Sequence, residues 1–233
     1  HLACDATSAV AVGRLRDRKQ RDEKPFAVMV RDLEGARALA WLDAAEEALL
    51  ASVERPIVLV RRLSAASLAP EVAPGNPLVG LVLAYTPLHH LLLEAAGRPL
   101  VMTSGNRSDE PMAVKDAEAL ARLGGIADLF VAHDREIENR CDDSVARVIA
   151  GRPTMFRRSR GYVPRAVRLR RPVRRPVLAC GAHLKNTFCL AAGDEAREVL
   201  DRAAATLVRK VTPVANPLGL PVTIDIPIVY ELE

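Results

Sequence analysis

The chain alternates short apolar runs with stretches in which apolar residues recur every three or four positions. The runs are rich in β-forming residues and predict buried strands, because such residues favour extended segments inside a layered fold. These runs predict strands at residues 26–30, 56–60, 78–83, 100–103, 129–132, 144–149 and 154–157. The helical spacing predicts helices at residues 33–42, 43–53, 88–96 and 115–123. This alternation predicts an α/β (α+β) fold.

The last part of the chain departs from this pattern. Residues 1–165 are expected to form one α/β domain, and the Arg- and Pro-rich residues 166–176 are expected to form a linker. Two further apolar runs predict the opening β-hairpin of a second domain, to which we assign residues 177–233. No element is predicted within residues 211–233, because four prolines there are awkward for a packed element.

Composition limits the class of protein. With 233 residues, of which 49% are hydrophobic and 27% charged, the chain can bury one core, or one domain with part of a second. No apolar run approaches the roughly 20 residues of a membrane span, so no membrane partner is expected. The four cysteines include no C-x-x-C pair, which favours a reducing cytoplasm over a disulfide framework. The first residue is not Met and no signal-peptide pattern follows, so we expect the middle of a longer protein.

Positive charge is concentrated in one region. Residues 144–193 contain no Asp or Glu. The arginines that concentrate charge there are Arg152, Arg157, Arg158, Arg160, Arg165, Arg168, Arg170, Arg171, Arg174 and Arg175. Guanidinium groups bind phosphate or carboxylate through paired hydrogen bonds, so one interpretation is a polyanionic partner. The other is a solvated basic linker, and RNA is not favoured because few aromatic side chains stand nearby for base stacking.

Two polar clusters lie next to predicted strands. Lys19 and Arg21 are two positions apart, so an extended backbone would direct both cations to one face, where they could hold ATP phosphates. Ser104 and Asn106 have the same spacing, and Gly105 between them lets a ligand approach the backbone. A solvated basic turn and an Asx or Ser turn explain these clusters as well.

The remaining candidate residues are acidic side chains and arginines. Asp109 and Asp143 are predicted to lie near Mg²⁺ that is bound to phosphates. Arg158 and Arg160 are candidates for contacts to phosphate. The chain has neither a Walker loop nor a G-x-G-x-x-G loop, so side chains would have to hold any bound ATP. Cys141 has no partner histidine pattern, and we assign neither a catalytic nucleophile nor a protein metal site.

Several motifs resemble those of known adenylate-forming proteins. The K-x-R motif of the YrdC/Sua5 family, which makes carbamoyl-type adenylates from ATP, is matched by Lys19-Gln20-Arg21, and its S-x-N motif by Ser104-Gly105-Asn106. Longer blocks are similar to the HypF carbamoyltransferase family of [NiFe]-hydrogenase maturation. These blocks are residues 24–29, 85–93, 103–111, 139–145 and 157–164. The resemblance covers residues 2–192.

The resemblance implies a twisted mixed sheet flanked by helices, followed by the first hairpin of a Kae1-like domain. It implies ATP and Mg²⁺ as cofactors, carbamoyl phosphate or carbamate as substrate, and the C-terminal cysteine of a HypE-like protein as acceptor. Lys19 and Arg21 would then hold phosphates, while Ser104, Asn106 and Ser144 would position the carbamoyl group.

This sequence also departs from the HypF pattern. It lacks the family's acylphosphatase-like and zinc-finger segments and most of the Kae1-like domain, so the resemblance implies a fragment. Position 84 is Ala where the family usually has Pro, and position 183 is His where an acidic residue is common. We therefore expect adenylate formation rather than complete carbamoyl transfer. Two other functions stay open: threonylcarbamoyl-AMP synthesis for tRNA modification, and a nonenzymatic RNA-binding module.

Overall fold

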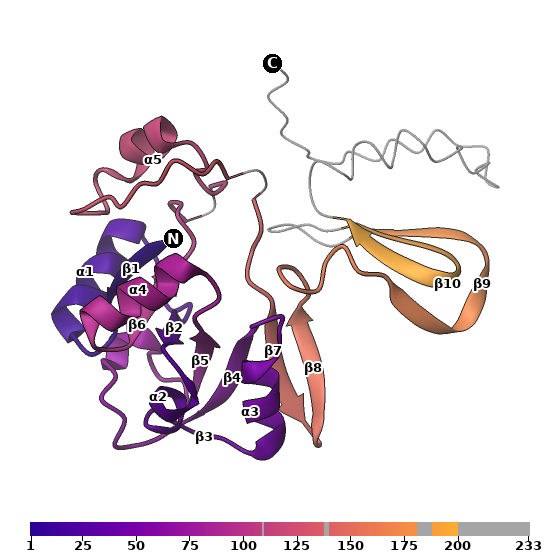
Figure 1. Cartoon of the computed structure of the whole chain (residues 1–233), viewed down its shortest axis with the longest axis horizontal. Coiled ribbons are helices and arrows are strands. Elements are labelled where there is room, and N and C mark those ends of the chain that lie inside the picture. Colours follow the sequence, from indigo (N-terminus) through magenta and orange to yellow (C-terminus); the bar gives the residue numbers. More distant parts are fainter. Residues whose placement is uncertain (109, 138–139, 181–187, 200–233) are drawn as a thin grey trace.

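The computed structural model describes residues 1–108, 110–137, 140–180 and 188–199 (Figure 1). The strands of its main sheet are β1 (Leu2–Asp5), β2 (Ala27–Val30), β3 (Ala40–Trp41), β4 (Ile57–Arg62), β5 (Leu78–Leu83), β6 (Leu100–Thr103), β7 (Val145–Ile149) and β8 (Arg152–Arg157). The helices are α1 (Ala9–Lys19), α2 (Leu33–Arg37), α3 (Ala44–Ala51), the 3₁₀ turn η1 (Pro70–Val72), α4 (Pro87–Ala96) and α5 (Asp116–Leu123).

The main sheet is mixed. Its strand order is β1-β6-β2-β5-β4-β7-β8, and β3 pairs with β4 at the side. The pairs β2–β5 and β4–β7 are parallel, whereas the other pairs in the sheet are antiparallel. The predicted α/β fold with a mixed sheet is therefore confirmed.

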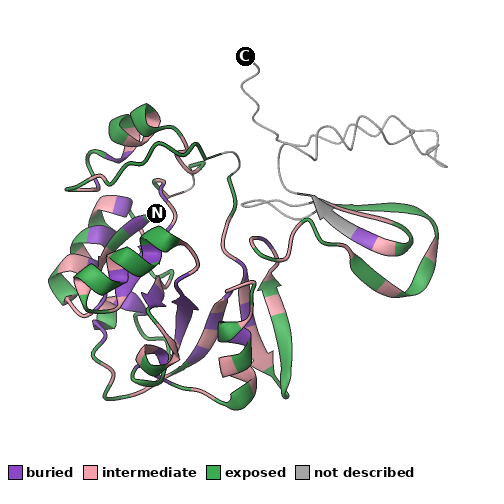
Figure 2. Cartoon of the chain, in the orientation of Figure 1, coloured by how far each residue is buried: buried purple, intermediate pink, exposed green. Residues whose placement is uncertain are grey.

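Helices cover both faces of this sheet, and alternation along β5 shows how the two faces are divided. Val79 and Leu81 belong to the larger core, into which α1 and α3 also direct buried side chains. Val82 belongs to a smaller core that includes Leu93 of α4. Successive strand residues point to opposite faces, so one apolar strand supplies both cores. Figure 2 shows the buried residues gathered on the central strands.

Local capping explains why two predicted helices begin and end where they do. Asp43 forms a capping box with Glu46 at the start of α3. Thr86 accepts a hydrogen bond from His89 N at the start of α4, and Pro87 occupies the first turn. Gly97 closes α4 with a left-handed φ of 63°. Both helices were predicted from the sequence.

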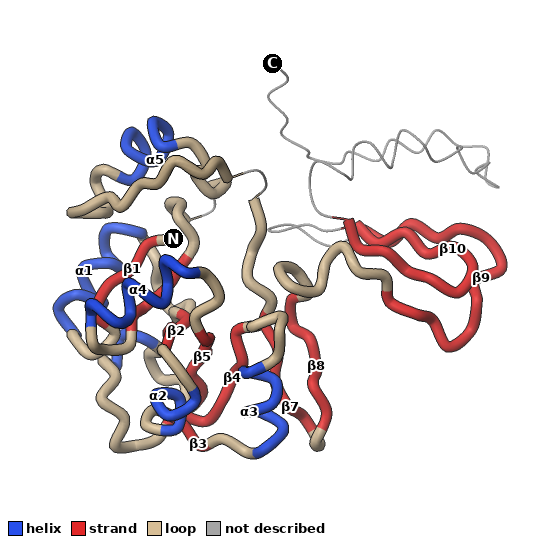
Figure 3. The backbone as a smooth tube through the Cα atoms, viewed as in Figure 1, coloured by secondary structure: helices blue, strands red, loops and turns tan. Residues whose placement is uncertain are grey.

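Three parts of the main domain differ from the prediction. The helix expected over residues 33–42 ends at Arg37, because the chain enters β3 and pairs with β4. Residues 129–132 are loop, not strand, and belong to the tan stretch that follows α5 (Figure 3). Leu129 and Val131 in this loop are exposed. The elements β1 and α1 were not predicted; Ser8 caps α1 by accepting a hydrogen bond from Ala11 N.

The basic segment after the main domain is a strand. Residues 166–176 were expected to be a linker, but β9 (Val167–Cys180) includes nearly all of them and pairs antiparallel with β10 (Phe188–Val199). That expectation is wrong, because the segment is a strand. Pro172 and Pro176 are tolerated in it, since β9 has only one partner in this two-stranded ribbon. The predicted hairpin is present and starts earlier than expected. The tail at residues 200–233 lies outside the described residues, and the division into domains stays a prediction.

None of the helices in the described ranges is long and apolar enough to cross a membrane.

Candidate functional site

The K-x-R segment does not have the extended geometry expected from its spacing. Lys19 is the last residue of α1, and Gln20 closes the helix in the left-handed conformation, with φ 52° and ψ 54°. The turn at Gln20 separates the side chains of Lys19 and Arg21, which contact different segments. The prediction that both cations lie on one face of an extended strand is therefore wrong.

Lys19 is buried against the loop that contains the S-x-N motif, which we call the SGN loop (Ser104–Asn106). Only 2% of Lys19 is exposed. Its Nζ donates to Ser104 O at 2.8 Å, to Asn106 Oδ1 at 2.9 Å and to Asn106 O. These contacts join residues more than eighty positions apart, so the structure brings together three of the predicted site residues.

Further hydrogen bonds hold the SGN loop in place. Ser104 Oγ donates to Asn106 Oδ1 at 2.6 Å, and Asn106 Nδ2 donates to Glu110 O at 2.6 Å. Ser108 Oγ lies within hydrogen-bonding distance of both Lys19 O (2.9 Å) and Gln20 O (3.0 Å). The loop is thus attached to the end of α1 through both its backbone and its side chains.

Arg21 lies over the ring of Phe26, with its Cζ 4.7 Å from the ring centroid. Its Nε donates to Lys24 O at 3.0 Å and its Nη2 to Pro25 O at 2.7 Å. Burial, with the like charges of Arg16 and Arg157, lowers the pKa of Arg21 to about 10. The Arg21 guanidinium stays protonated at neutral pH. An anion placed beside it would relieve its repulsion from Arg16 and Arg157.

A second group of polar residues, which we call the Tyr85 cluster, consists of His1, Tyr85, His89, Asp143 and Arg160. The guanidinium of Arg160 lies 3.5 Å from the Tyr85 ring centroid, and its Nε donates to Asp143 Oδ1 at 2.6 Å. His1 Nε2 is 3.6 Å from Asp143 Oδ2, and the rings of Tyr85 and His89 meet edge to face at 4.5 Å. The cluster therefore joins the chain start, α4 and the segment after β8.

Burial and charge shift the pKa values in this cluster. Burial opposes the charged form of Asp143, but His1 and Arg160 outweigh that penalty and lower its pKa to about 2. Burial is the main cause that lowers the pKa of His89 to about 4, and the neighbouring His1 and Arg160 add to this effect. At neutral pH the structure therefore holds a carboxylate at Asp143 and an uncharged imidazole at His89.

Arg160 and Arg158 donate hydrogen bonds to backbone carbonyls of the protein. Arg160 Nη1 and Nη2 donate to the carbonyls of Glu54 and Arg55, at 3.1 and 2.7 Å. Arg158 Nη2 donates to the carbonyls of Tyr162 (3.0 Å) and Arg165 (2.7 Å). The Arg160 contacts fasten the segment after β8 to the segment before β4, whereas the Arg158 contacts lie within the segment after β8.

Ser144, a predicted carbamoyl-positioning residue, is fully buried. Its Oγ donates to Arg160 O at 2.8 Å and accepts from Ser159 N at 2.7 Å. The structure therefore places it inside the packing between β7 and the segment after β8, apart from the SGN loop contacts. Its assignment to substrate stays a prediction.

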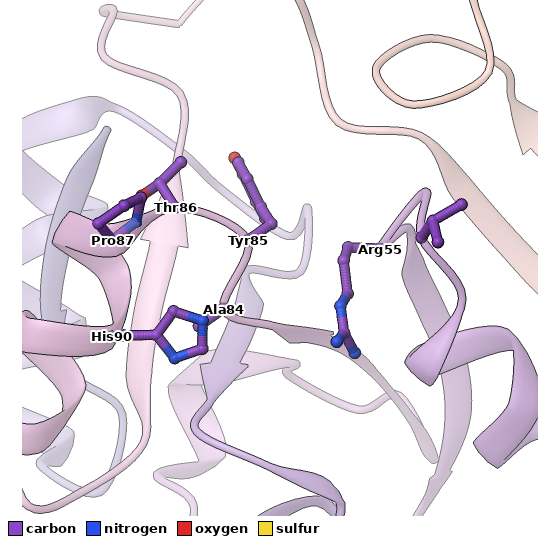
Figure 4. Close-up of a pocket in the computed structure, with 7 residues that line it drawn as sticks. Arg55, Ala84, Tyr85, Thr86, Pro87 and His90 are labelled. Carbon is purple, nitrogen blue, oxygen red and sulfur yellow. The ribbon is translucent and has the colours of Figure 1, made fainter.

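The two polar groups meet at His1. A Cβ added to Gly105 would lie 3.6 Å from His1 N, while the His1 ring belongs to the Tyr85 cluster. Beside Tyr85 is a pocket of about 390 Å³, lined by Val53, Arg55, Ala84, Tyr85, Thr86, Pro87 and His90. Figure 4 shows Arg55 and His90 entering this pocket from different elements, with Tyr85 between them.

The acidic residues that were predicted to lie near Mg²⁺ can be compared with the described part of the chain. No group of three or more His, Cys, Asp or Glu side chains suited to a metal occurs there. Asp143 Oδ1 is 2.6 Å from Arg160 Nε, so a metal cation at this carboxylate would have to displace the arginine from an existing ion pair. Asp109, the other residue predicted near Mg²⁺, lies outside the described residues.

Sequence reasoning did not select His1, His89 and Tyr85 as site residues. The buried strand β5 is followed by Ala84 and then by Tyr85. His89 is a buried histidine on an otherwise leucine-rich helix. A polar aromatic residue directly after a buried strand is a usable signal. The position of His1 depends on the pairing of β1 with β6, which the local pattern did not predict.

Comparison with known proteins places this arrangement in a family. The model of the Sua5/YciO/YrdC family, described as "Telomere recombination", matches residues 1–159. The chain belongs to the Sua5/YciO/YrdC family. The K-x-R and S-x-N segments that meet at Lys19 both lie within the matched range.

Curated relatives of this family member are longer proteins. The carbamoyltransferase HypF of Rhizobium leguminosarum bv. viciae is 52% identical over 203 aligned residues, in a match that covers 84% of this chain and 26% of the relative. The HypF of Synechocystis sp. is 45% identical over 196 residues, with the same coverage. The chain thus spans about a quarter of the length of these relatives.

Solved structures agree with the sequence matches. Full-length HypF in a phosphate- and nucleotide-bound form is similar with a TM-score of 0.79 and 44% identity, over 85% of this chain and 26% of that one. Sua5 of P. abyssi bound to L-threonine has a TM-score of 0.60 at 18% identity, over 67% of this chain and 46% of that one, and shows the shared fold. The resemblance to HypF expected from the sequence is confirmed.

Proposed function

We propose that this chain is the adenylate-forming part of a HypF-like carbamoyltransferase. It binds ATP with Mg²⁺, takes carbamate derived from carbamoyl phosphate, and forms carbamoyl adenylate. The observation that carries this proposal is the junction of Lys19 with Ser104 and Asn106, which joins both family motifs in one place. The identity of 45–52% to curated HypF carbamoyltransferases supports the carbamoyl group as the substrate class.

The reaction needs alignment and charge neutralisation rather than a protein nucleophile. A carboxylate oxygen of carbamate attacks the α-phosphorus of ATP, and the bond from this phosphorus to the oxygen bridging to the β-phosphorus breaks. Pyrophosphate leaves with that oxygen, and carbamoyl adenylate remains. No proton moves in this step, which fits a site without an assigned general base.

Arg21 is the residue we assign to the phosphates. Its Nε and Nη2 contact backbone carbonyls, and neither hydrogen of its Nη1 has a partner in the described part of the chain. Repulsion from Arg16 and Arg157 also favours an anion beside it. Arg158 and Arg160 instead hold the segment after β8, and we assign them supporting roles.

Mg²⁺ enters this proposal as part of the substrate MgATP. The described residues offer no cluster of metal ligands, so phosphate oxygens and water would supply the coordination. The ion would neutralise charge on the leaving pyrophosphate.

Transfer of the carbamoyl group belongs to the longer protein. The thiolate of a C-terminal cysteine on a HypE-like partner attacks the carbamoyl carbon, and AMP leaves with the bridging oxygen. This step needs a docked partner, and the chain spans about a quarter of its HypF relatives. We therefore propose adenylate formation for this chain and transfer for the longer protein.

The test is exchange of labelled pyrophosphate into ATP by the 233-residue chain. We expect exchange that depends on carbamate and Mg²⁺ and not on L-threonine. Arg21→Ala should raise the KM for ATP by about 10- to 100-fold, the value of a lost charged hydrogen bond. Arg14→Ala is the matched control, because Arg14 is exposed and pairs only loosely with Asp128, at 3.7 Å.

Two results would overturn the proposal. Exchange that requires L-threonine would identify a threonylcarbamoyl-AMP synthase. Absence of exchange, combined with salt-dependent RNA binding, would favour an RNA-binding module.

A further inference from the structure

Arg16 is a buried arginine of α1 to which neither family motif assigns a role, and only 8% of it is exposed. A guanidinium has five N–H hydrogens and no acceptor. All three of its nitrogens donate to backbone carbonyls, over distances of 2.5–3.4 Å. The carbonyls are those of Arg21, Asp22, Lys24, Glu71 and Val72. Five hydrogens thus meet five carbonyls, and Arg16 keeps no donor for a ligand.

Arg16 holds the segment between α1 and β2, which we call the α1–β2 connection (residues 20–26), from both of its ends. Its Nη1 donates to Arg21 O at 3.0 Å, and Arg21 N donates back to Arg16 O at 3.0 Å. At the other end, Val72 O of η1 accepts from Arg16 Nη2 at 3.4 Å and from Phe26 N at 2.8 Å. The course of the connection is therefore fixed around one guanidinium.

The side chain of Arg21 depends on the same two supports as Arg16. Lys24 O accepts from Arg16 Nη2 at 3.3 Å and from Arg21 Nε at 3.0 Å. The guanidinium carbons of both arginines lie 4.7 Å from the centroid of the Phe26 ring, which is 1% exposed. An aromatic ring attracts a cation and orients the plane of a guanidinium that stacks on it. A carbonyl held by Arg16 and a buried ring thus determine where Arg21 lies.

The two arginines differ in what they leave for a ligand. Every nitrogen of Arg16 donates to the protein, whereas Arg21 Nη1 has no partner in the part of the chain that the structure describes. Arg21 is also partly exposed, while Arg16 is buried. An anion that enters here would therefore contact Arg21, and Arg16 would act on it only through the position of Arg21.

We propose that Arg16 is a positioning residue that sets the place and orientation of Arg21 for the phosphates of ATP. The inference rests on the proposed function and adds to it a residue outside both family motifs. Arg16 acts through the carbonyls of the α1–β2 connection and does not touch the substrate. Lysine cannot take over this role, because its three hydrogens leave at least two of the five carbonyls unpaired and it lacks the planar fork.

Arg16→Lys tests the positioning role, because it keeps the positive charge and removes the fork. In pyrophosphate exchange the KM for ATP should rise by about tenfold, since Arg21 is displaced, and the KM for carbamate should stay within about twofold. Arg18→Lys is the matched control: Arg18 is also an arginine of α1 that donates to a backbone carbonyl, Ile126 O at 2.9 Å, away from the α1–β2 connection. It should leave both KM values unchanged.

Two outcomes of this comparison overturn the inference. An unchanged KM for ATP in Arg16→Lys would mean that the charge alone suffices. A merely structural role would reduce the amount of active protein and lower kcat, without a KM that rises for ATP and stays constant for carbamate.

A double variant shows whether Arg16 acts through Arg21. Once Arg21→Ala has removed the group that Arg16 positions, Arg16→Lys should change the KM for ATP by less than about twofold. A further tenfold rise in the double variant would mean that Arg16 acts on ATP independently, and it would overturn the inference.

Phe26→Leu is a second variant, which carries the test if Arg16→Lys does not fold. Leucine keeps an apolar side chain in the core and removes the ring that both guanidinium groups contact. The KM for ATP should rise by about threefold, the effect of a lost cation–ring contact, and the KM for carbamate should not change. An unchanged KM for ATP would contradict the positioning of Arg21 by this arrangement.

Calorimetry with MgATP distinguishes failure of this inference from failure of the proposed function. If the wild-type chain binds MgATP without exchange, only the proposed reaction fails, and the Kd for MgATP replaces the KM in the same comparisons. If the wild-type chain shows exchange and Arg16→Lys matches it in the KM for ATP, only the inference fails. A wild-type chain that does not bind MgATP overturns both.

Discussion

Lys19 is a buried cation and Arg160 is a partly buried one, and the two occupy different chemical surroundings. Lys19 donates to amide and carbonyl oxygens of the SGN loop. Arg160 pairs with the carboxylate of Asp143, covers the ring of Tyr85 and donates to two further carbonyls. The first arrangement leaves a donor and an acceptor for a ligand, whereas the second leaves none of the three guanidinium nitrogens without a protein partner.

From this difference we assign the SGN loop around Lys19 a role in recognising a ligand. We assign Arg160 a fastening role, in which it holds segments of the protein together. The Tyr85 cluster contains titratable neighbours, and its packing should respond to pH and to the loss of charge. The SGN loop contributes amide and carbonyl oxygens to its hydrogen bonds with Lys19, and these groups do not change protonation state near neutral pH. We therefore expect changes in the Tyr85 cluster to act first on folding, and changes in the SGN loop to act on substrate.

The largest expected effect comes from Arg160→Ala. The change removes the ion pair at 2.6 Å and leaves the mostly buried carboxylate of Asp143 without its arginine. Removing one partner of a buried pair costs about 4 kcal/mol, so the free energy of unfolding should fall by that amount in urea denaturation. Arg152→Ala, an exposed arginine of β8, should change it by less than about 0.5 kcal/mol. Equal stability of the two variants would contradict the fastening role.

A smaller effect is expected from the pH dependence of stability at His89. Its folded pKa of about 4 lies below the ordinary value of 6.5, because burial disfavours the imidazolium. Between these values the unfolded chain binds a proton that the folded chain refuses, so stability falls as pH drops from 6.5 to 4, by about 3 kcal/mol in total.

Thermal unfolding across this pH range checks the prediction. His89→Gln should flatten the curve, whereas His133→Gln, which changes an exposed histidine, should leave its slope unaltered. A slope that persists in His89→Gln would assign the proton uptake to another group.

Local patterns predicted the parts of the fold that are set by local chemistry. The strand at residues 78–83 and the helix closed by Gly97 have the expected bounds within one residue, because apolar runs and caps are readable within a short window. The segment that became β9 was misread because its arginines and prolines are typical of linkers. Pairing with β10, a contact between distant segments, decides its structure.

The sequence predicted which residues form the candidate site better than it predicted how their side chains are arranged. Lys19, Ser104 and Asn106 were selected and do meet, but the expected extended spacing failed at Gln20, a non-glycine residue in the left-handed region. The arginines near Gly161 were selected for their charge. Their partners, Asp143 and distant backbone carbonyls, depend on tertiary packing that no spacing rule contains.

The smallest expected effect separates two glycines that share a left-handed backbone. Gly161 has φ 86°, and a Cβ there would lie 2.6 Å from Glu54 O, the carbonyl that Arg160 also contacts. Gly151 has φ 72° and open space around the same position. Gly161→Ala and Gly151→Ala both incur the left-handed penalty of about 1 kcal/mol, and only the first adds a backbone clash of about 2 kcal/mol. Urea denaturation should show that difference, and equal losses would mean that the segment after β8 moves away from β4 without cost.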